Sequence, residues 1–275
     1  MKVKIYFQVL SIVITQLAEA QSSSTLMGAR GAGLGYTSAA LEDEWALFNN
    51  VAGLARVEQV STAFAYELRP ALTGANRTAA SIAAPIKIGT LGVGIFRFGD
   101  DLYSEHMLSL GVGNQIGNTS LGVKINYIQY RAESFGVTTA VSADFGGITK
   151  ITSQFSLAAY ITNLTQSKLI GSNGERLPTK LTVGLAFRPT EKIVMGSEIE
   201  KDLDYKATWR SGVEYSIYKK VLFRTGFNLN PNATYFGIGA VKKNLKIDYA
   251  IRFNRLTGAS HQASAIYTIP SKKKK

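Results

Sequence analysis

Residues 120–127 read Ser-Leu-Gly-Val-Lys-Ile-Asn-Tyr, and apolar residues alternate in this stretch with polar or small ones. Successive side chains of a β-strand point to opposite sides, so Leu121, Val123, Ile125 and Tyr127 fall on one face of an extended chain. The opposite face carries Ser120, Gly122, Lys124 and Asn126. The first face suits lipid and the second suits water, which is the pattern of a strand in a transmembrane barrel.

The same two-faced pattern recurs along the chain, for example over residues 181–188 and 245–254. From residue 57 onward, runs of about ten residues are separated by Gly, Asn, Asp and Pro turns, as in barrels of the outer membrane. A soluble β-sandwich also alternates, but its buried faces rarely continue for so long through so many strands. We therefore predict an all-β fold, a transmembrane antiparallel β-barrel over residues 57–270.

The turns divide the barrel region into fourteen strands, an even number, although twelve remains an alternative. The predicted strands are 58–68, 77–88, 90–99, 104–115, 119–131, 135–146, 153–164, 178–188, 192–200, 206–217, 220–229, 233–242, 245–255 and 260–269. With both termini in the periplasm, the longer connections, such as 165–177, face outward. The short ones, such as Gly117-Asn118 and Pro189-Thr190-Glu191, face the periplasm.

The first twenty residues are typical of a secretory signal peptide. Lys2 and Lys4 precede an apolar run over residues 5–17, and the small residues Ala18 and Ala20 follow it. The run is shorter than the roughly 20 apolar residues of a membrane-spanning helix. We expect cleavage after residue 20, which leaves a mature chain of 255 residues (275 minus 20). We expect this chain in the outer membrane of a Gram-negative-type cell envelope.

Composition excludes several classes of function. The chain has no Cys and two His, so neither a disulfide scaffold nor a thiolate metal site is expected. The formal net charge is +12, but an exported protein does not meet nucleic acid, and we expect no such partner. Neither a G-x-S-x-G elbow nor an H-E-x-x-H pair occurs. The sequence therefore predicts a protein without enzymatic activity, cofactor or metal.

Residues 21–56 do not alternate and precede the first predicted strand. They contain a glycine-rich run at 28–35, whose spacing is not that of a dinucleotide loop, and buried-type aromatics at Trp45 and Phe48. A flexible tail would expose these aromatics to water, so we expect the segment to dock in the lumen as a plug. The residues assigned to this plug or constriction are Gly28, Arg30, Gly31, Gly33, Glu42, Asp43, Trp45, Phe48, Asn50 and Gly53.

The order of these elements resembles the start of PorV/PorQ-type barrels, relatives of the FadL fatty-acid channels. The matching pieces are the glycine-rich run 28–35, the acidic pair Glu42-Asp43, and residues 50–54, where Val51 stands in place of the family's proline. Weaker likeness continues through Val183-Gly184-Leu185-Ala186 and Phe223-Arg224-Thr225-Gly226-Phe227. The resemblance implies a FadL-like barrel that works as an accessory subunit of the type IX protein secretion system.

Charged residues of both signs fall on the predicted lumen face. They are Glu198, Arg210, Glu214, Arg224, Lys246, Asp248 and Arg252. One interpretation is that they pair with one another and fill a narrow lumen, since an unpaired charge in a dry interior is costly. The other is a polar pathway or ligand contact beside the plug. Phe96, Phe98 and Tyr160 are the few apolar candidates for a lumen pocket.

Lysines gather at the predicted periplasmic connections and in a basic C-terminal tail, residues 271–275. This basic rim comprises Lys87, Lys150, Lys192, Lys219, Lys220, Lys242, Lys243, Lys272, Lys273, Lys274 and Lys275. We assign acids such as Glu105 and Asp202 to the outer connections, where Arg69, Arg77 and Arg176 dilute the trend. A basic rim binds anionic headgroups or docks an acidic partner.

Three hypotheses follow. The first is a non-enzymatic accessory barrel of a secretion or surface-assembly complex, with outer-membrane lipid and a protein as partners. The second is a FadL-like passive channel for small apolar or amphipathic compounds, gated by the N-terminal segment. The third is a barrel that only scaffolds the membrane.

Overall fold

The antiparallel strands of the chain close on themselves. The structure is a computed structural model that describes residues 24–170, 174–203 and 205–270. Within these residues, fourteen strands pair with their neighbours in sequence, and β1 pairs with β14 to close the barrel. The fold class and the strand number predicted from the alternation are confirmed. No helix in the described part is long and apolar enough to cross a membrane.

The strands follow the predicted ranges with shifts of up to four residues at their ends. They are β1 Ser61–Leu68, β2 Arg77–Ile86, β3 Gly89–Gly99, β4 Tyr103–Ile116, β5 Thr119–Ala132, β6 Gly136–Lys150, β7 Phe155–Thr162, β8 Lys180–Thr190, β9 Ile193–Asp202, β10 Thr208–Ile217, β11 Val221–Leu229, β12 Ala233–Lys242, β13 Leu245–Asn254 and β14 Gly258–Thr268. One predicted turn is wrong. Pro189 and Thr190 belong to β8, where a register irregularity absorbs them.

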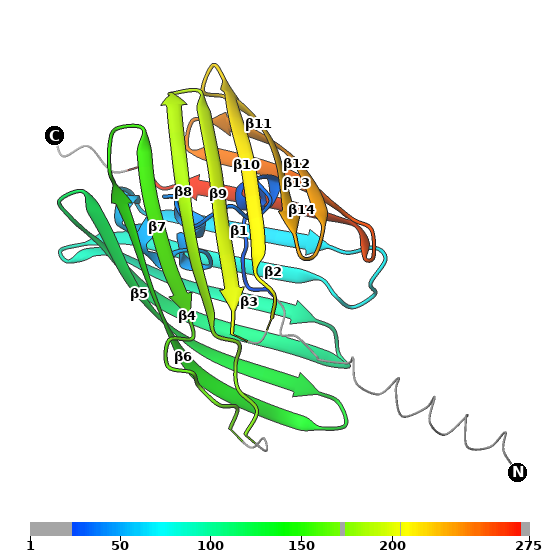
Figure 1. Cartoon of the computed structure of the whole chain (residues 1–275). Coiled ribbons are helices and arrows are strands. Elements are labelled where there is room, and N and C mark those ends of the chain that lie inside the picture. Colours follow the sequence, from blue (N-terminus) through cyan, green and yellow to red (C-terminus); the bar gives the residue numbers. More distant parts are fainter. Residues whose placement is uncertain (1–23, 171–173, 204, 271–275) are drawn as a thin grey trace, which may run out of the picture.

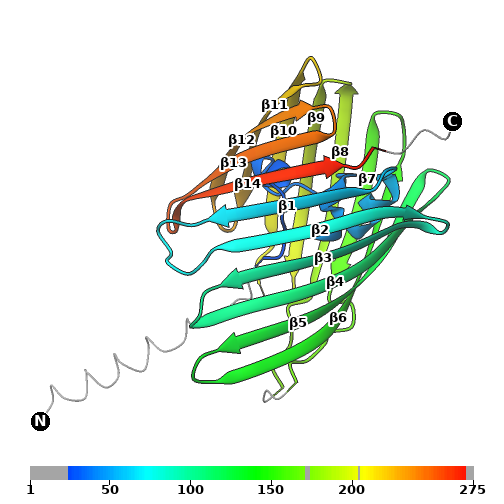
Figure 2. The ribbon, with the colours of Figure 1, turned by 180° about the vertical axis from the view of Figure 1, so that it is seen from behind.

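Both ends of the strand series lie at the same end of the barrel, since Ser61 of β1 pairs with Thr268 of β14. We call this the inner end, and the opposite one the outer end. The connections at the inner end are short, as at 117–118 and 243–244, and the longest connection of the barrel, 163–179, lies at the outer end. Figure 2 shows β1 to β5 side by side, with their connections at the two ends.

The two faces of each strand differ as the alternation predicts. In β5, Ile125 is 53% exposed on the outer wall, whereas the inward-facing Lys124 is 3% exposed. Inward-facing side chains such as Lys124 are covered by other parts of the chain. Residues 24–57, here called the lumenal segment, lie inside the barrel and cover part of its inward face (Figure 1). They form the short helices α2 Ala29–Gly33, η2 Glu44–Leu47 and η3 Val51–Arg56.

Glycines on the lumen face make room for this segment. Gly113, Gly122 and Gly146 are direct neighbours across β4, β5 and β6. A Cβ at Gly122 would lie 2.6 Å from the backbone nitrogen of Ala52. Because backbone atoms cannot move aside as a flexible side chain does, only glycine allows η3 to touch the wall.

A second row of glycines faces the other half of the lumenal segment. Gly196, Gly212 and Gly226 are register neighbours across β9, β10 and β11. A Cβ at Gly212 or at Gly226 would lie 2.4 Å from backbone atoms of Leu34. The two rows let the segment run along the inside wall at backbone contact distance.

Candidate functional site

Two side-chain caps shape the lumenal segment. The carboxylate of Asp43 accepts a hydrogen bond from the backbone nitrogen of Trp45 at 3.0 Å and begins η2. The side-chain oxygen of Asn50 accepts one from the nitrogen of Ala52 at 3.2 Å and begins η3. Each cap satisfies a backbone donor that the helix leaves open. Val51 is the first residue of η3 and is buried.

Small residues of the segment allow its turns to pack. Gly28 has φ +101°, and a Cβ there would lie 2.5 Å from the ring of Trp45. Gly53 faces the carbonyl oxygen of Leu41, which a Cβ would approach to 2.5 Å. Trp45 and Phe48 are both buried, in one apolar cluster with side chains of the barrel wall. Both aromatic side chains thus pack against the barrel wall inside the lumen, where the sequence analysis expects the segment to dock.

Gly31 and Gly33 lie in α2, the part of the segment that packs against β12 and β13. Both are buried, and the backbone of Gly33 lies against Gly237 and the side chain of Arg224.

Arg30 joins the lumenal segment to the barrel wall. Its guanidinium donates to both carboxylate oxygens of Glu214, at 2.8 and 3.0 Å, and to Asp43 at 3.1 Å. Burial alone would lower the pKa of Arg30, but the carboxylates of Glu214 and Asp43 more than offset this and raise the pKa above its ordinary value. Arg30 therefore stays charged inside the lumen.

The predicted charge network is paired almost throughout. Glu214 also accepts from Arg224 at 2.6 Å, and Arg224 donates to Asp248 at 2.6 Å. Arg210 donates to Glu198 at 2.9 Å. Charges that are paired and hydrogen-bonded in this way are tolerated in a dry interior. If one partner is removed, the other remains buried without compensation for its desolvation.

Glu198 binds the lumenal segment as well. Its carboxylate accepts hydrogen bonds from the backbone nitrogens of Ser38 and Ala39 at 2.9 and 2.8 Å. Lys246 reaches Glu44 of η2 at 3.3 Å. Arg252 lies over the ring of Tyr235, 5.9 Å from its centroid. Three of the seven predicted lumen charges, Glu198, Glu214 and Lys246, therefore bond directly to residues 24–57, and the other four contact residues of the wall.

Glu42 completes the contacts of the segment at the inner end. Its carboxylate pairs with Arg56 at 3.4 Å and with Lys150 of β6 at 3.3 Å. Lys150 is one of the predicted rim lysines. The other rim lysines in the described residues lie exposed at inner-end connections or strand ends: Lys87, Lys192, Lys219, Lys220, Lys242 and Lys243. Lys219 pairs with Glu191 at 2.6 Å. The predicted signal peptide, residues 1–20, and the predicted basic tail, residues 271–275, lie outside the described residues.

A second charge cluster at the outer end was missed by the sequence analysis. Glu67 of β1 pairs with Arg77 of β2 and with Arg69 at 2.7 Å. Arg77 also donates to the hydroxyl of Tyr36 and, at 2.6 Å, to the carbonyl oxygen of Ser24. Burial raises the pKa of Tyr36, which therefore remains a neutral donor. The cluster fastens the first described residues to the wall.

Three charged residues assigned to the outer connections face the lumen instead. Glu105, Asp202 and Arg77 are all nearly buried within or at the ends of β4, β9 and β2. The assignment was wrong because charge at a strand end does not distinguish a solvated loop from an inward-facing strand position.

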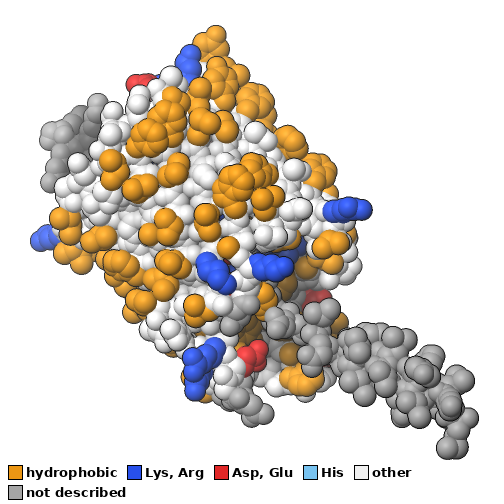
Figure 3. Space-filling view, in the orientation of Figure 1, with side chains coloured by type: hydrophobic (Ala, Val, Ile, Leu, Met, Phe, Trp, Pro, Cys, Tyr) orange, Lys and Arg blue, Asp and Glu red, His pale blue; other side chains and the backbone are white. Residues whose placement is uncertain are grey.

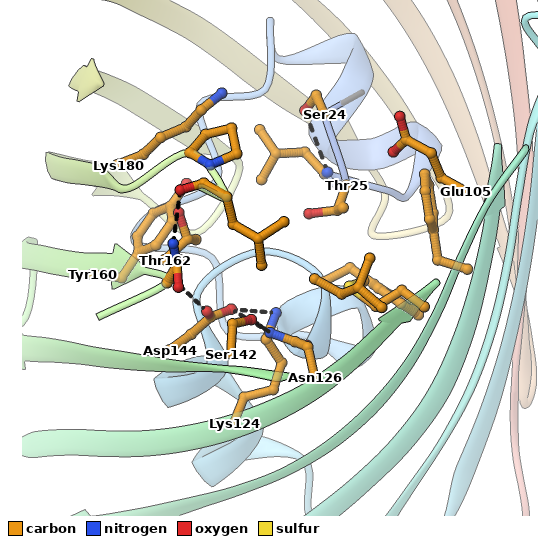
Figure 4. A pocket seen from close by; sticks show the side chains of 18 of the residues that line it. Ser24, Thr25, Glu105, Lys124, Asn126, Ser142, Asp144, Tyr160, Thr162 and Lys180 are labelled. Atoms are coloured by element: carbon orange, nitrogen blue, oxygen red, sulfur yellow. Dashed lines mark hydrogen bonds and ion pairs between the residues drawn. The ribbon is translucent and has the colours of Figure 1, made fainter. Parts of the chain in front are cut away.

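The described lumen holds a cavity of about 100 Å³ toward the outer end. Its apolar side is formed by Phe48 of the lumenal segment with Phe96, Met107 and Ile128 of the wall, and Leu26 borders it. Tyr160 also lines it, so two of the three apolar candidates predicted from sequence lie here. Figure 4 shows the side chains converging on the cavity from β4 to β8 and from residues 24–25.

The polar side of the cavity is a connected network. Lys124 pairs with Asp144 at 2.8 Å, and Asn126 donates to the same carboxylate at 3.2 Å. The other oxygen of Asp144 accepts from the backbone nitrogen of Asn163 at 2.8 Å. Lys180 and Glu200 border the cavity nearer the outer end. One apolar side and one polar side make the cavity suited to a compact amphipathic molecule.

Comparisons with known proteins bear on the fold. No protein-family model matches the chain, and no curated protein matches its sequence. A crystal structure of a Pseudomonas aeruginosa FadL homologue matches 90% of this chain and 100% of that one, with 12% identity and a TM-score of 0.62. A deltaS2 mutant of the TodX monoaromatic hydrocarbon channel matches over the same shares, with 13% identity and a TM-score of 0.66.

A third match lies farther away. The Acinetobacter baumannii outer membrane protein Omp33 covers 77% of this chain and 98% of its own, with 8% identity and a TM-score of 0.51. At these identities the likeness shows the fold alone. The chain has the fold of outer-membrane β-barrels of the FadL type.

Proposed function

We propose that the protein spans an outer membrane and takes up a small amphipathic compound at its outer end, as a channel that residues 24–57 close. The apolar outer wall supports the membrane placement. Figure 3 shows apolar side chains spread over the middle of the wall on one face. Val183 and Ile199, for instance, are 53% and 54% exposed. Together, the exposed apolar side chains of the strands form more apolar surface than a soluble protein leaves to water.

The lumen cavity is the observation that carries the function. It opens between the first described residues and strands β3 to β8, and the lumenal segment separates it from the inner end. The apolar side contributed by Phe48 belongs to that same segment. A bound molecule would therefore touch the element that blocks the way inward.

Passage through the barrel needs a rearrangement of the lumenal segment. Arg30, Ser38 and Ala39 are bonded to wall carboxylates, and at the glycine rows the segment lies directly against the backbone of the wall. We propose a gate rather than a permanently open pore. Within the lumenal segment, the short helices η2 and η3 lie nearest to the cavity and to the inner end of the barrel.

Binding in the cavity is tested with one tryptophan placed inward and one placed outward on the same strand. Ile128→Trp fills the cavity, whereas Ile125→Trp adds the same ring to the outer wall. Saturation-transfer NMR with benzoate and with toluene measures binding to each purified variant. We expect signals from the wild type and Ile125→Trp, and loss with Ile128→Trp. Equal signals from all three proteins would exclude the cavity as the binding site.

The accessory role in type IX secretion is a second candidate, which the exposed basic rim favours. Lys242 and Lys243 represent this rim at the turn between β12 and β13. A pull-down in mild detergent, followed by mass spectrometry, compares Lys242→Glu/Lys243→Glu with the outer-end variant Lys201→Glu/Lys206→Glu. Secretion-system subunits that are lost only with the inner-end variant would support this role. A barrel that is isolated alone would exclude it.

A further inference from the structure

The outer wall over β1 to β5 has a groove of about 580 Å³. Four apolar side chains, Phe64, Ile95, Leu108 and Tyr127, form its sides. Ala80 lies between Phe64 and Ile95 in direct register with both, and its short side chain makes the hollow. The groove lies on the wall seen in Figure 2.

Polar side chains head the groove at the outer end. Thr78, Arg97, His106 and Gln129 are successive register neighbours across β2, β3, β4 and β5. All four line the groove. Each of them lies within four residues of the outer end of its strand. They form a continuous polar row above the apolar side chains.

The cation of this row, Arg97, and its neighbour His106 lack acidic partners among the described residues. Within residues 24–170, 174–203 and 205–270, the side chains of Arg97 and His106 take part in no hydrogen bond or ion pair. Arg131 lies two residues beyond Gln129 on β5 and faces outward as well, also without such a partner. Inside the lumen, in contrast, arginines such as Arg224 are paired. An arginine on a lipid-facing wall is favourable where it meets an anionic headgroup.

We propose that this groove binds a phosphorylated glycolipid of the outer leaflet, the lipid A class. Its phosphate lies at Arg97 and His106, where Gln129 donates a further hydrogen bond, and an acyl chain follows the apolar side chains toward the middle of the wall. Arg97 supplies a guanidinium that matches phosphate geometry. The inference rests on the proposed membrane placement, but not on the lumen cavity or on transport.

Native mass spectrometry of the full chain in detergent, titrated with purified lipid A, tests the site. Arg97→Gln/His106→Gln removes the headgroup contacts, and Lys201→Gln removes an outward-facing cation on β9, outside the groove. We expect lipid A binding to fall at least about tenfold for the double variant, the loss of one to two charge-assisted contacts. Binding to Lys201→Gln should equal that of the wild type.

Ala80→Trp tests the apolar part without touching the polar row. We expect this variant, folded as judged by its electrophoretic mobility before and after heating, to lose lipid A binding. Equal binding by the wild type, the double variant and Ala80→Trp would overturn the proposal. Displacement of lipid A by inorganic phosphate, or equal affinity for phosphatidylglycerol, would overturn the assignment of the lipid. Benzoate binding in the cavity is measured separately, so the failure of one claim does not imply the failure of the other.

Discussion

Arg30 of the lumenal segment and Glu214 of β10 are joined by two hydrogen bonds, at 2.8 and 3.0 Å, although 184 positions separate them in the chain. Glu214 holds Arg224 at the same time. One carboxylate thus neutralises a cation of the wall and a cation of the segment that fills the lumen. This shared carboxylate therefore fastens the lumenal segment to the wall.

Glu214→Gln should destabilise the folded protein strongly. It leaves Arg30 and Arg224 buried with fewer anionic partners, which costs about 3–5 kcal/mol for a buried pair. Urea unfolding in lipid vesicles measures the free energy of unfolding. The matched control is Glu191→Gln, because the Glu191–Lys219 pair is exposed and its loss should leave stability unchanged. Similar effects of both substitutions would contradict the shared-carboxylate account.

Gly212→Ala should push the lumenal segment away from the wall. The new Cβ would lie 2.4 Å from the carbonyl oxygen of Leu34, an overpacking that costs about 1–3 kcal/mol. Gly147→Ala is the control, because the nearest atom to a Cβ there is 3.4 Å away. Limited proteolysis should cut residues 24–57 faster in the first variant only. Equal cleavage of both variants would show that the glycine row does not position the segment.

Val51→Pro should be tolerated, whereas Ala52→Pro should not. Proline suits the first position of a helix, and Val51 occupies that position in η3. The backbone N–H of Ala52, in contrast, donates to the side chain of Asn50. Proline has no N–H, so this hydrogen bond would be lost in Ala52→Pro. Thermal unfolding should give Ala52→Pro a free energy of unfolding about 1–2 kcal/mol lower than that of Val51→Pro. The reverse order would contradict the observed cap.

Leu185→Lys should be costly if the wall faces lipid. Leu185 is the middle residue of β8 and lies on the outer face, where a lysine costs about 2–4 kcal/mol in a bilayer. Leu68→Lys, at the outer end of β1, should cost only about 0–1 kcal/mol. Unfolding in vesicles compares the two. Equal costs in vesicles would argue against the proposed membrane placement.

Much of the fold could be predicted from the sequence, because alternation reports directly on the two environments of a strand. Lys124 and Ile125 fall on the predicted faces, and the number of strands is correct. The ends of strands were less certain. Pro189 looks like a turn residue in sequence, yet it continues β8 beside a register irregularity.

The candidate site was predictable only in part. Charges of the lumen face could be identified by their place in the alternation, but their partners in residues 24–57 could not, since no sequence pattern relates Arg30 to Glu214. Glycine has no side chain that reports a face, so the rows at Gly122 and Gly212 were not recognised. Their signal is a glycine near the middle of successive inward faces. Glu67 and Arg77 were missed because they end strands beside a polar connection.

Conductance across a planar lipid bilayer tests most directly whether residues 24–57 close the lumen. The wild-type protein is compared with a variant that lacks residues 24–56 and with Arg30→Gln/Glu214→Gln, each checked for folding by its mobility before and after heating. The closed-lumen account predicts no steady current from the wild type, large lasting steps from the deletion and brief openings from the double variant. A wild-type protein that conducts as much as the deletion variant would contradict it.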